Sequence, residues 1–176
     1  GLPALLKKHV KLEKGASVFA YFVNDPTRYG VVSFKDNQPY QILEKPKPAP
    51  SNWAVTGLYF YDNQVVNFAK SLKPSARGEL EITDINNLYL QKNQLTVEKL
   101  GRGMAWLDTG THQSLLDASN FVEVIESRQG QKIACLEEIA YRMGYIDAKH
   151  LKAHAERLSS SQYGAYLQTW IQREGL

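Results

Sequence analysis

One acidic residue occupies a position suited to metal binding. Asp108 follows an apolar run at residues 104–107, which predicts a buried strand, and precedes a Thr-Gly turn. A carboxylate there offers hard oxygen atoms, and Mg²⁺ takes one or two carboxylates together with phosphate oxygens. Asp108 is therefore a candidate Mg²⁺ ligand. Its position fits equally well a cap on the helical pattern that begins near Thr111 and His112.

A Glu-Lys-Pro sequence at residues 44–46 ends another strand-like run. Adjacent side chains of a strand point to opposite faces, so Glu44 and Lys45 can share one site only if the strand ends or twists there. Pro46 indicates that the strand does end. Lys45 could neutralise a phosphate as a point charge, and Glu44 could accept hydrogen bonds from sugar hydroxyls. A solvated ion pair at a strand end is equally compatible with this pattern.

A loop arginine, two glycines and several aromatic residues complete the set of candidates. Arg77 lies in a loop between two helical patterns and could reach a phosphate or remain solvated. Gly30 and Gly57 interrupt strand-like runs, where glycine permits the close approach of a ligand or marks a bulge. The aromatic residues that could carry a sugar, or simply fill the core, are Tyr29, Trp53, Tyr59, Tyr61 and Trp106.

Composition excludes several classes of protein. The 176 residues are 43% hydrophobic and 22% charged, which is typical of a globular protein with one domain or a core plus a small appendage. A net charge of +3 is too small to indicate a nucleic-acid partner. No apolar run approaches the ~20 residues of a membrane span. We therefore expect neither nucleic acid nor membrane as a partner.

Residue types also limit the chemistry. Cys135 is the only cysteine, so a reduced, cytoplasmic setting fits, and zinc binding is not indicated because the cysteine and the four histidines lack ligand spacing. A Gly-x-Ser-x-Gly nucleophile motif and a Gly-rich phosphate loop are both missing from the sequence. The chain begins without methionine, and we expect that processing or truncation removed a preceding part.

The first part of the chain is predicted to contain both strands and helices, and the last part only helices. Strands are predicted over residues 17–23, 29–34, 40–43, 53–61, 95–100 and 104–107, the second and third of them forming a hairpin. Helical spacing covers residues 3–10, 64–72, 80–90, 112–127, 136–143, 148–158 and 163–173. In the fourth of these helices, six residues are expected to face inward: Leu115, Leu116, Ala118, Phe121, Val122 and Ile125. Asp147 and Ser161 are the predicted N-caps of the last two.

The change of composition near Gly130 predicts two parts. Residues 1–127 are expected to form a mixed α/β body, and residues 128–176 a helical C-terminal segment.

Five blocks of sequence, in their order along the chain, resemble the bacterial sugar nucleotidylyltransferases, and among these the glucose-1-phosphate thymidylyltransferases. The blocks are residues 28–32, 43–46, 51–61, 77–86 and 103–111. The resemblance continues through the helical end of the chain. It covers only the later part of the family pattern, because the opening Gly-Gly-x-Gly-Thr-Arg loop and a further metal-binding aspartate are not found in these residues. It implies part of a mixed-sheet, three-layer nucleotide-diphospho-sugar transferase fold.

The resemblance also implies roles for individual residues. Tyr29, Gly30, Glu44 and Val55 would line a glucose site. Lys45 and Arg77 would hold the sugar phosphate, while Asp108 would bind Mg²⁺ with Trp106 packed nearby. A regulatory nucleotide site at a subunit interface would involve Arg102, Lys132, Glu138 and Arg142. Family members are commonly homotetramers.

The implied reaction converts dTTP and glucose 1-phosphate to dTDP-glucose and pyrophosphate, for dTDP-rhamnose and surface polysaccharide synthesis. A sister enzyme that uses another sugar or base stays open, because the base is read mainly by the part not in this sequence. The sequence is also compatible with a non-catalytic sugar-phosphate-binding module, or with a misfolded fragment that exposes strand edges.

Overall fold

The most apolar strand-like run of the sequence lies inside a β-sheet. In the computed structural model, which describes residues 1–176, β1 (Ala16–Phe22) pairs antiparallel with β4 (Trp53–Tyr61) and parallel with β5 (Leu95–Lys99). The first five residues of β1 are buried. Both edges of β1 are thus paired, so this strand does not expose the edges that were expected of a misfolded fragment.

The predicted hairpin extends this sheet. β2 (Gly30–Lys35) and β3 (Gln38–Glu44) are joined by Asp36 and Asn37, whose φ angles of 49° and 63° lie in the left-handed region. Two successive residues of this conformation are typical of a tight hairpin turn. The strand order is β3-β2-β4-β1-β5. The prediction of a mixed sheet is confirmed.

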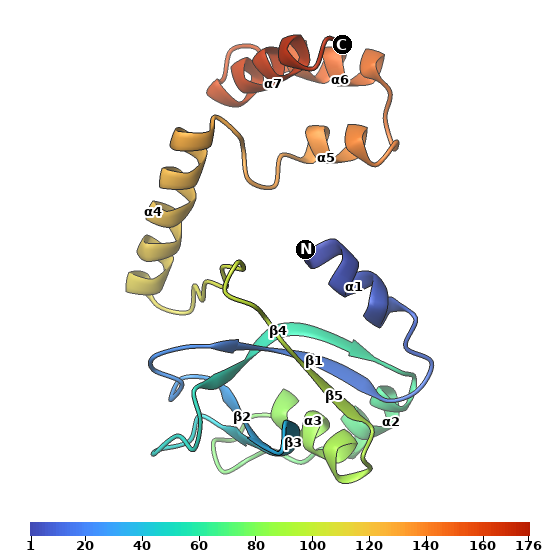
Figure 1. Cartoon of the computed structure of the whole chain (residues 1–176), viewed down its shortest axis with the longest axis vertical. Coiled ribbons are helices and arrows are strands. Elements are labelled where there is room, and N and C mark those ends of the chain that lie inside the picture. Colours follow the sequence, from blue (N-terminus) through green and yellow to red (C-terminus); the bar gives the residue numbers. More distant parts are fainter. The chain divides into compact units, whose positions relative to one another are not determined.

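Helices cover both faces of the sheet (Figure 1). They are α1 (Leu2–Val10), α2 (Gln64–Ser71) and α3 (Ile82–Gln91). The buried His9 of α1 packs edge-on against Phe19 of β1, with ring centroids 5.1 Å apart. On the other face, Tyr89 of α3 packs in one cluster with Ala16 of β1. Adjacent side chains of β1 point to opposite faces of the sheet. The fold therefore has three layers, with α1 on one face of the sheet and α2 and α3 on the other.

The strand predicted over residues 104–107 is wrong, since these residues have no regular secondary structure. Pairing with β1 ends at Lys99, after which the backbone N–H of Leu100 donates to the carbonyl of Ala20 at 2.8 Å. The chain then leaves the sheet, and residues 104–107 do not pair with the free edge of β5. The Tyr21 hydroxyl instead donates to the carbonyl of Met104 at 3.0 Å and fixes the segment.

The chain divides into two compact units, Gly1–Trp106 and Leu107–Leu176. The second unit is helical throughout and contains α4 (His112–Gln129), α5 (Leu136–Arg142), α6 (Ala148–Arg157) and α7 (Gln162–Arg173). Its core consists of Cys135, Leu151, Ala155, Leu167, Trp170 and Ile171. The predicted N-caps are confirmed, since Asp147 accepts from His150 N at 2.8 Å and Ser161 from Gly164 N at 3.0 Å. The expected division into residues 1–127 and 128–176 stays a prediction.

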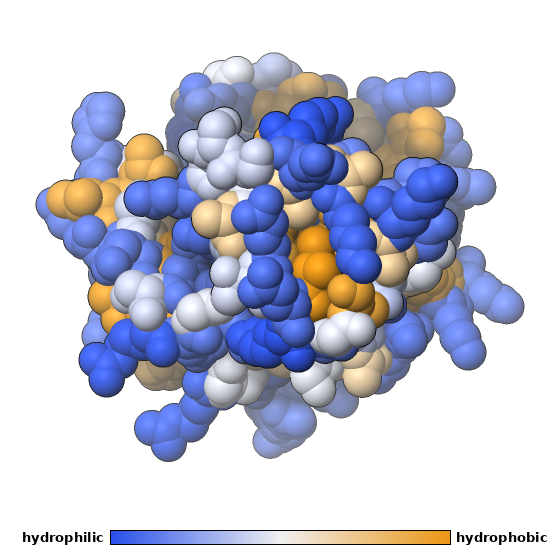
Figure 2. All heavy atoms as spheres, turned by 90° about the horizontal axis from the view of Figure 1, so that it is seen from above, coloured by the Kyte–Doolittle hydropathy of each residue, from blue (hydrophilic) through white to orange (hydrophobic).

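The inward face predicted for α4 is largely wrong. Only Ala118 of this helix is buried, while Leu115, Leu116 and Phe121 are exposed. The helical spacing of these residues is real, but the core of the second unit is made by α6, α7 and the residues around α5. Across the face drawn in Figure 2, hydrophilic side chains predominate and apolar ones show between them in patches. None of the helices combines the length and the apolar character needed to span a membrane.

Asp62 ties together the elements at one end of the sheet. Its carboxylate accepts hydrogen bonds from Gly15 N at 2.7 Å, Tyr89 Oη at 2.7 Å and Gln64 N at 3.0 Å. Partial burial alone would raise the pKa of Asp62, but these hydrogen bonds outweigh it and lower the pKa to about 2. The ionised carboxylate is therefore the form that stabilises the fold.

A pH dependence of stability follows from this shift. A folded-state pKa below the ordinary 3.8 contributes stability that is fully present above pH 3.8 and disappears as the pH falls through about 2. Replacing Asp62 with asparagine should cost about 1–2 kcal/mol of unfolding free energy at pH 7. The gap between variant and native protein should shrink as the pH is lowered to 3 and below. Urea denaturation at pH 7, 4 and 3 measures both, and a pH-independent gap would contradict the assignment.

Candidate functional site

The end of β3 brings an acidic and a basic side chain to the same place. Glu44 is the last residue of β3, and Lys45 adopts a φ of 44°, in the left-handed region. Lys45 Nζ lies 4.0 Å from Glu44 Oε1, and the Lys45 backbone N–H donates to the carbonyl of Tyr29 at 3.0 Å. The condition predicted from the sequence, that the strand must end for both side chains to share a site, is met.

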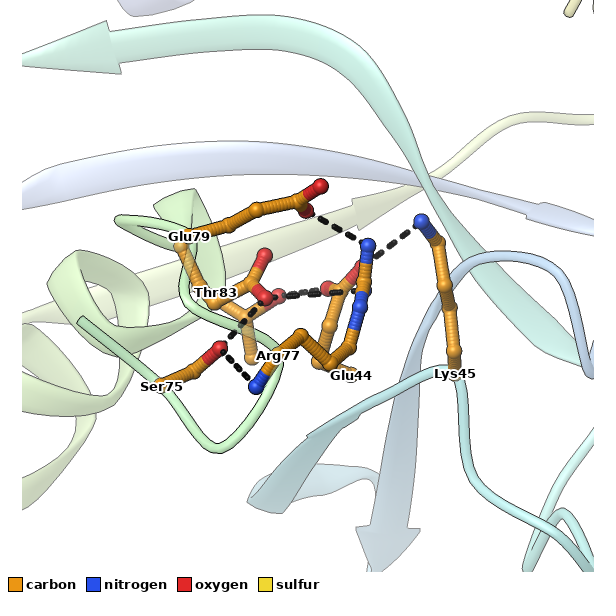
Figure 3. Close-up of polar contacts among 7 residues, drawn as sticks. Glu44, Lys45, Ser75, Arg77, Glu79 and Thr83 are labelled. Atoms are coloured by element: carbon orange, nitrogen blue, oxygen red, sulfur yellow. Dashed lines mark hydrogen bonds and ion pairs between the residues drawn. The ribbon is translucent and has the colours of Figure 1, made fainter.

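Arg77 reaches the same carboxylate from a separate loop. The loop is closed by hydrogen bonds from Ser75 N to Glu79 O and from Gly78 N to Ser75 O, both 2.8 Å. Gly78 has a φ of 78°, a conformation that favours glycine. Arg77 Nη1 lies 3.6 Å from Glu44 Oε1 (Figure 3). The guanidinium is thus held among carboxylates, while the side chain of Arg77 is 39% exposed, so the role of Arg77 as a phosphate ligand stays a prediction beside that of a solvated loop arginine.

Gly30 makes room for the second oxygen of Glu44. Gly30 pairs with Glu44 across the β2–β3 ladder, and the Thr83 hydroxyl donates to Glu44 Oε2 at 2.5 Å. A Cβ atom at position 30 would lie 3.0 Å from Thr83 Oγ1 and 3.4 Å from Glu44 Oε2, with Val55 Cβ at 3.7 Å. Glycine at this position therefore permits the contact between α3 and β3. Gly57, in contrast, lies at an irregularity of the β1–β4 register and has an open space beside it, which fits a bulge.

Four residues of this cluster were not among the candidates taken from the sequence. Glu79 Oε2 lies 2.5 Å from Arg77 Nη2, and the buried Glu81 places Oε1 3.5 Å from Arg77 Nη1. Ser75 donates to Glu81 Oε1 at 3.0 Å, and Thr83 holds Glu44. The sequence does contain an indication of the two acids. Glu79 and Glu81 follow the Arg-Gly turn directly and are separated by one residue, which places both within reach of the arginine.

An aromatic group lies beside the charged cluster in the first unit. The Trp106 ring packs edge-on against Tyr29 at 5.0 Å between centroids and lies 6.0 Å from the Tyr21 ring. Trp106 also lines a cavity of about 720 Å³, together with Gly57 and other residues of β4 and of the segment after β5. Glycine and apolar residues dominate the lining of this cavity.

The pKa of Tyr59, a residue of β4, is raised by burial and, to a smaller extent, by the nearby negative charge of Glu44.

Asp108 belongs to the second unit. Its Oδ1 accepts a hydrogen bond from Gly110 N at 3.2 Å. The cap of α4 is Thr111, which forms a capping box with Ser114, so the interpretation that Asp108 caps this helix is wrong. The structure contains no group of three or more His, Cys, Asp or Glu side chains that could hold a metal ion. As a Mg²⁺ ligand, Asp108 would need phosphate oxygens to complete the coordination shell, and this role stays a prediction.

The residues expected to form a regulatory site divide between the two units. Lys132 Nζ pairs with Glu126 Oε2 at 2.6 Å, and Arg142 Nε with Glu138 Oε1 at 2.9 Å, all in the second unit. Glu138 also accepts from Tyr166, whose pKa is raised to about 12 by burial and by this hydrogen bond. Arg102 lies in the first unit.

Arg102 lines a separate cavity of about 450 Å³ in the first unit. The other lining residues are Tyr21, Phe22, Trp53, Lys99, Leu100 and Gly101. The shared regulatory role of Arg102, Lys132, Glu138 and Arg142 stays a prediction.

Comparison with known proteins identifies the family of this chain and its fold. The nucleotidyl transferase family matches residues 1–124. The chain belongs to this family. A protein of Bacillus anthracis, crystallised with a sucrose, has a TM-score of 0.61 at 43% identity, over 68% of this chain and 48% of that one. The predicted fold of a nucleotide-sugar transferase is thereby confirmed.

Within the family, the chain is similar to one particular kind of enzyme. A glucose-1-phosphate thymidylyltransferase of Neisseria meningitidis is 54% identical over 163 residues, which is 92% of this chain and 57% of that protein. One of Xanthomonas campestris is 52% identical over 174 residues, which is 98% of this chain and 59% of that protein. The chain therefore spans less than two thirds of the length of these relatives.

Proposed function

We propose that this chain forms the sugar-phosphate-binding part of a glucose-1-phosphate thymidylyltransferase. The observation that carries the proposal is the joining of Glu44, Lys45 and Arg77 from two distant segments, in a chain more than half identical to enzymes of that name. The cations of Lys45 and Arg77 suit the phosphate of a ligand, and the Glu44 carboxylate beside Gly30 suits its hydroxyl groups.

Each residue of the cluster has a distinct task in this proposal. Lys45 and Arg77 would bind the phosphate of glucose 1-phosphate, since one is a point charge and the other a planar fork of donors. Glu44 would accept hydrogen bonds from sugar hydroxyls next to Gly30 and Val55. Tyr29 and Trp106 would provide the apolar wall. The relatives' names include both glucose 1-phosphate and a thymidylyl group, which is why we propose dTTP as the second substrate.

The proposed reaction balances without a covalent enzyme intermediate. A phosphate oxygen of glucose 1-phosphate forms a bond to the α-phosphorus of dTTP, and the bond from that phosphorus to the pyrophosphate oxygen breaks. The products are dTDP-glucose and pyrophosphate. Two anions must be brought together, so the task of Lys45 and Arg77 is to hold one of them in line and to offset its charge.

Mg²⁺ fits this proposal through Asp108. Bound there, it would supply charge neutralisation at the reacting phosphates. The Asp108 carboxylate provides hard oxygen atoms, of which Oδ1 already accepts from Gly110 N and is oriented by it. A cytoplasmic location, a homotetramer, regulation through a second nucleotide site and a place in dTDP-rhamnose synthesis belong to the same proposal and rest on the family resemblance.

Replacing Lys45 with alanine tests the proposal. The dissociation constant for glucose 1-phosphate should rise about tenfold or more, because a charge-assisted contact to the phosphate is lost. The affinity for glucose should change less than twofold. Isothermal titration calorimetry of the purified chain with each ligand measures both. Lys70→Ala removes an exposed lysine of α2 and is the matched control.

The outcomes separate the proposed function from a binding module and from a sister enzyme. Equal affinity of the native and Lys45→Ala chains for glucose 1-phosphate would remove Lys45 from the site. The turnover assays use a protein that spans the full length of the relatives. In that protein, binding of glucose 1-phosphate without pyrophosphate release when dTTP and Mg²⁺ are added would support a binding module, and faster turnover with UTP than with dTTP would support a sister enzyme with another base.

A further inference from the structure

The charged cluster holds more carboxylates than cations. Glu44, Glu79 and Glu81 lie around Lys45 and Arg77, and Arg77 contacts all three acids. With each group in its ordinary ionised form, the cluster has a net charge of −1. A phosphate monoester, whose own charge is about −1.5 to −2 at pH 7, would be repelled by it. One carboxylate must therefore give way before such a ligand can bind to Arg77.

The three carboxylates differ in how firmly they are held. The side chain of Glu44 is 22% exposed and accepts from the Thr83 hydroxyl, while that of Glu81 is 11% exposed and accepts from Ser75. The side chain of Glu79 is 61% exposed. It nevertheless makes the shortest of the three contacts with Arg77, 2.5 Å between Oε2 and Nη2. Glu79 is the acid that can move into water at the lowest cost.

We propose that Glu79 is a positioning residue that occupies the guanidinium of Arg77 in the ligand-free protein and yields it to the phosphate of the ligand. This proposal rests on the proposed function, in which Arg77 binds the phosphate of glucose 1-phosphate. A phosphate oxygen can accept from Nη2 of Arg77 as Oε2 of Glu79 does, so one replaces the other with little change of geometry. The exchange leaves the charge at Arg77 balanced in both states.

The backbone of the loop allows this exchange. The carbonyl of Glu79 accepts from Ser75 N, and Arg77 N donates to Ser75 Oγ at 3.2 Å, so the turn is held by its main chain. Only the exposed side chain of Glu79 needs to rotate. In Figure 3, the Glu79 side chain reaches the guanidinium from above, Ser75 lies near the backbone of Arg77, and Lys45 stands on the far side of the guanidinium from Glu79. Glu81 and Glu44 keep the arginine in place while its outer nitrogen changes partner.

Replacing Glu79 with glutamine tests the exchange. The neutral amide keeps the shape of the side chain but competes less for the guanidinium, so glucose 1-phosphate should bind about two- to fivefold more tightly than to the native chain. The affinity for glucose, which has no phosphate, should stay within about 1.5-fold. Titration calorimetry at two salt concentrations measures these affinities. A purely structural role of Glu79 would weaken or preserve both affinities together.

Glu174→Gln is the matched control, because it also removes one negative charge from an exposed Glu beside an arginine, Arg173, at 3.9 Å. It should leave both affinities unchanged. If E79Q binds glucose 1-phosphate as tightly as the native chain does, or less tightly, the proposed role of Glu79 is wrong, while the proposed function still stands. If neither chain binds glucose 1-phosphate, the proposed function fails and the exchange fails with it. Tighter binding by both E79Q and the control would show a general charge effect and would also contradict the exchange.

Discussion

Replacing Arg77 with methionine should weaken the binding of glucose 1-phosphate by at least about thirtyfold. Methionine keeps the apolar stem but removes the guanidinium that contacts Glu44, Glu79 and Glu81. The phosphate would lose its contact with the guanidinium and would meet three carboxylates that Lys45 alone must balance. Losing one member of a partly buried charge pair costs about 2–5 kcal/mol, most of it from the charge left behind.

The same change should lower the stability of the first unit by about 1–3 kcal/mol, because Glu81 is buried and would keep only Ser75 as a partner. Thermal denaturation and titration calorimetry on the same samples separate the two effects. Arg77→Lys restores one charge without the fork and should recover part of the affinity. Arg173→Met, an exposed arginine of the second unit, is the control. Affinity within twofold of the native chain in a folded Arg77→Met protein would remove Arg77 from the site.

The sequence was informative wherever a site depended on neighbouring residues. Pro46 predicted that the strand ends there, which is the condition for Glu44 and Lys45 to lie together, and the positive φ of Lys45 meets this condition. The hairpin, the strand at residues 53–61 and the caps at Asp147 and Ser161 follow equally from local patterns. Each of these predictions needed only the preferences of a few adjacent residues.

Contacts between distant segments could not be found in the same way. Thr83 meets Glu44 because α3 packs over the β2–β3 hairpin, at a place where Gly30 has no side chain to obstruct it. Nothing near position 83 in the sequence indicates this partner. The strand predicted before Asp108 failed for a related reason. An apolar run forms a strand only if it pairs with another strand, and residues 104–107 are held instead by the hydrogen bond from the Tyr21 hydroxyl to the carbonyl of Met104.

The apolar face of α4 shows the same limit for helices. Its spacing correctly predicted a helix, and residues 112–129 form it. Periodicity gives the face of a helix that is apolar but not what covers that face. The core of the second unit is filled by Trp170, Leu167 and Leu151 from α6 and α7, which leaves Leu116 exposed.

The close packing of α7 against the end of α6 makes the second unit sensitive to substitution of Gly164. Replacing Gly164 with alanine should destabilise the second unit by more than about 3 kcal/mol. A Cβ atom at position 164 would lie 2.0 Å from the carbonyl oxygen of Leu158 and 2.8 Å from Ser159 N, both of them backbone atoms that cannot rotate away. Helix propensity alone would favour alanine by about 1 kcal/mol. The clash exceeds this gain, because relieving it requires the first turn of α7 to move away from the end of α6.

The fluorescence of Trp170 reports on this change directly, because this buried ring belongs to the core of the second unit, while Trp53 and Trp106 belong to the first. Urea denaturation of Gly164→Ala, in a chain with Trp53 and Trp106 replaced by phenylalanine, should show an earlier transition than the Gly164 parent of the same background. Gly57→Ala, at a site with nothing within 4 Å of the added atom, should leave this transition in place. An unchanged midpoint for Gly164→Ala would mean that the helix start moves freely, and the close approach of α7 to Leu158 would then not be a constraint on the fold.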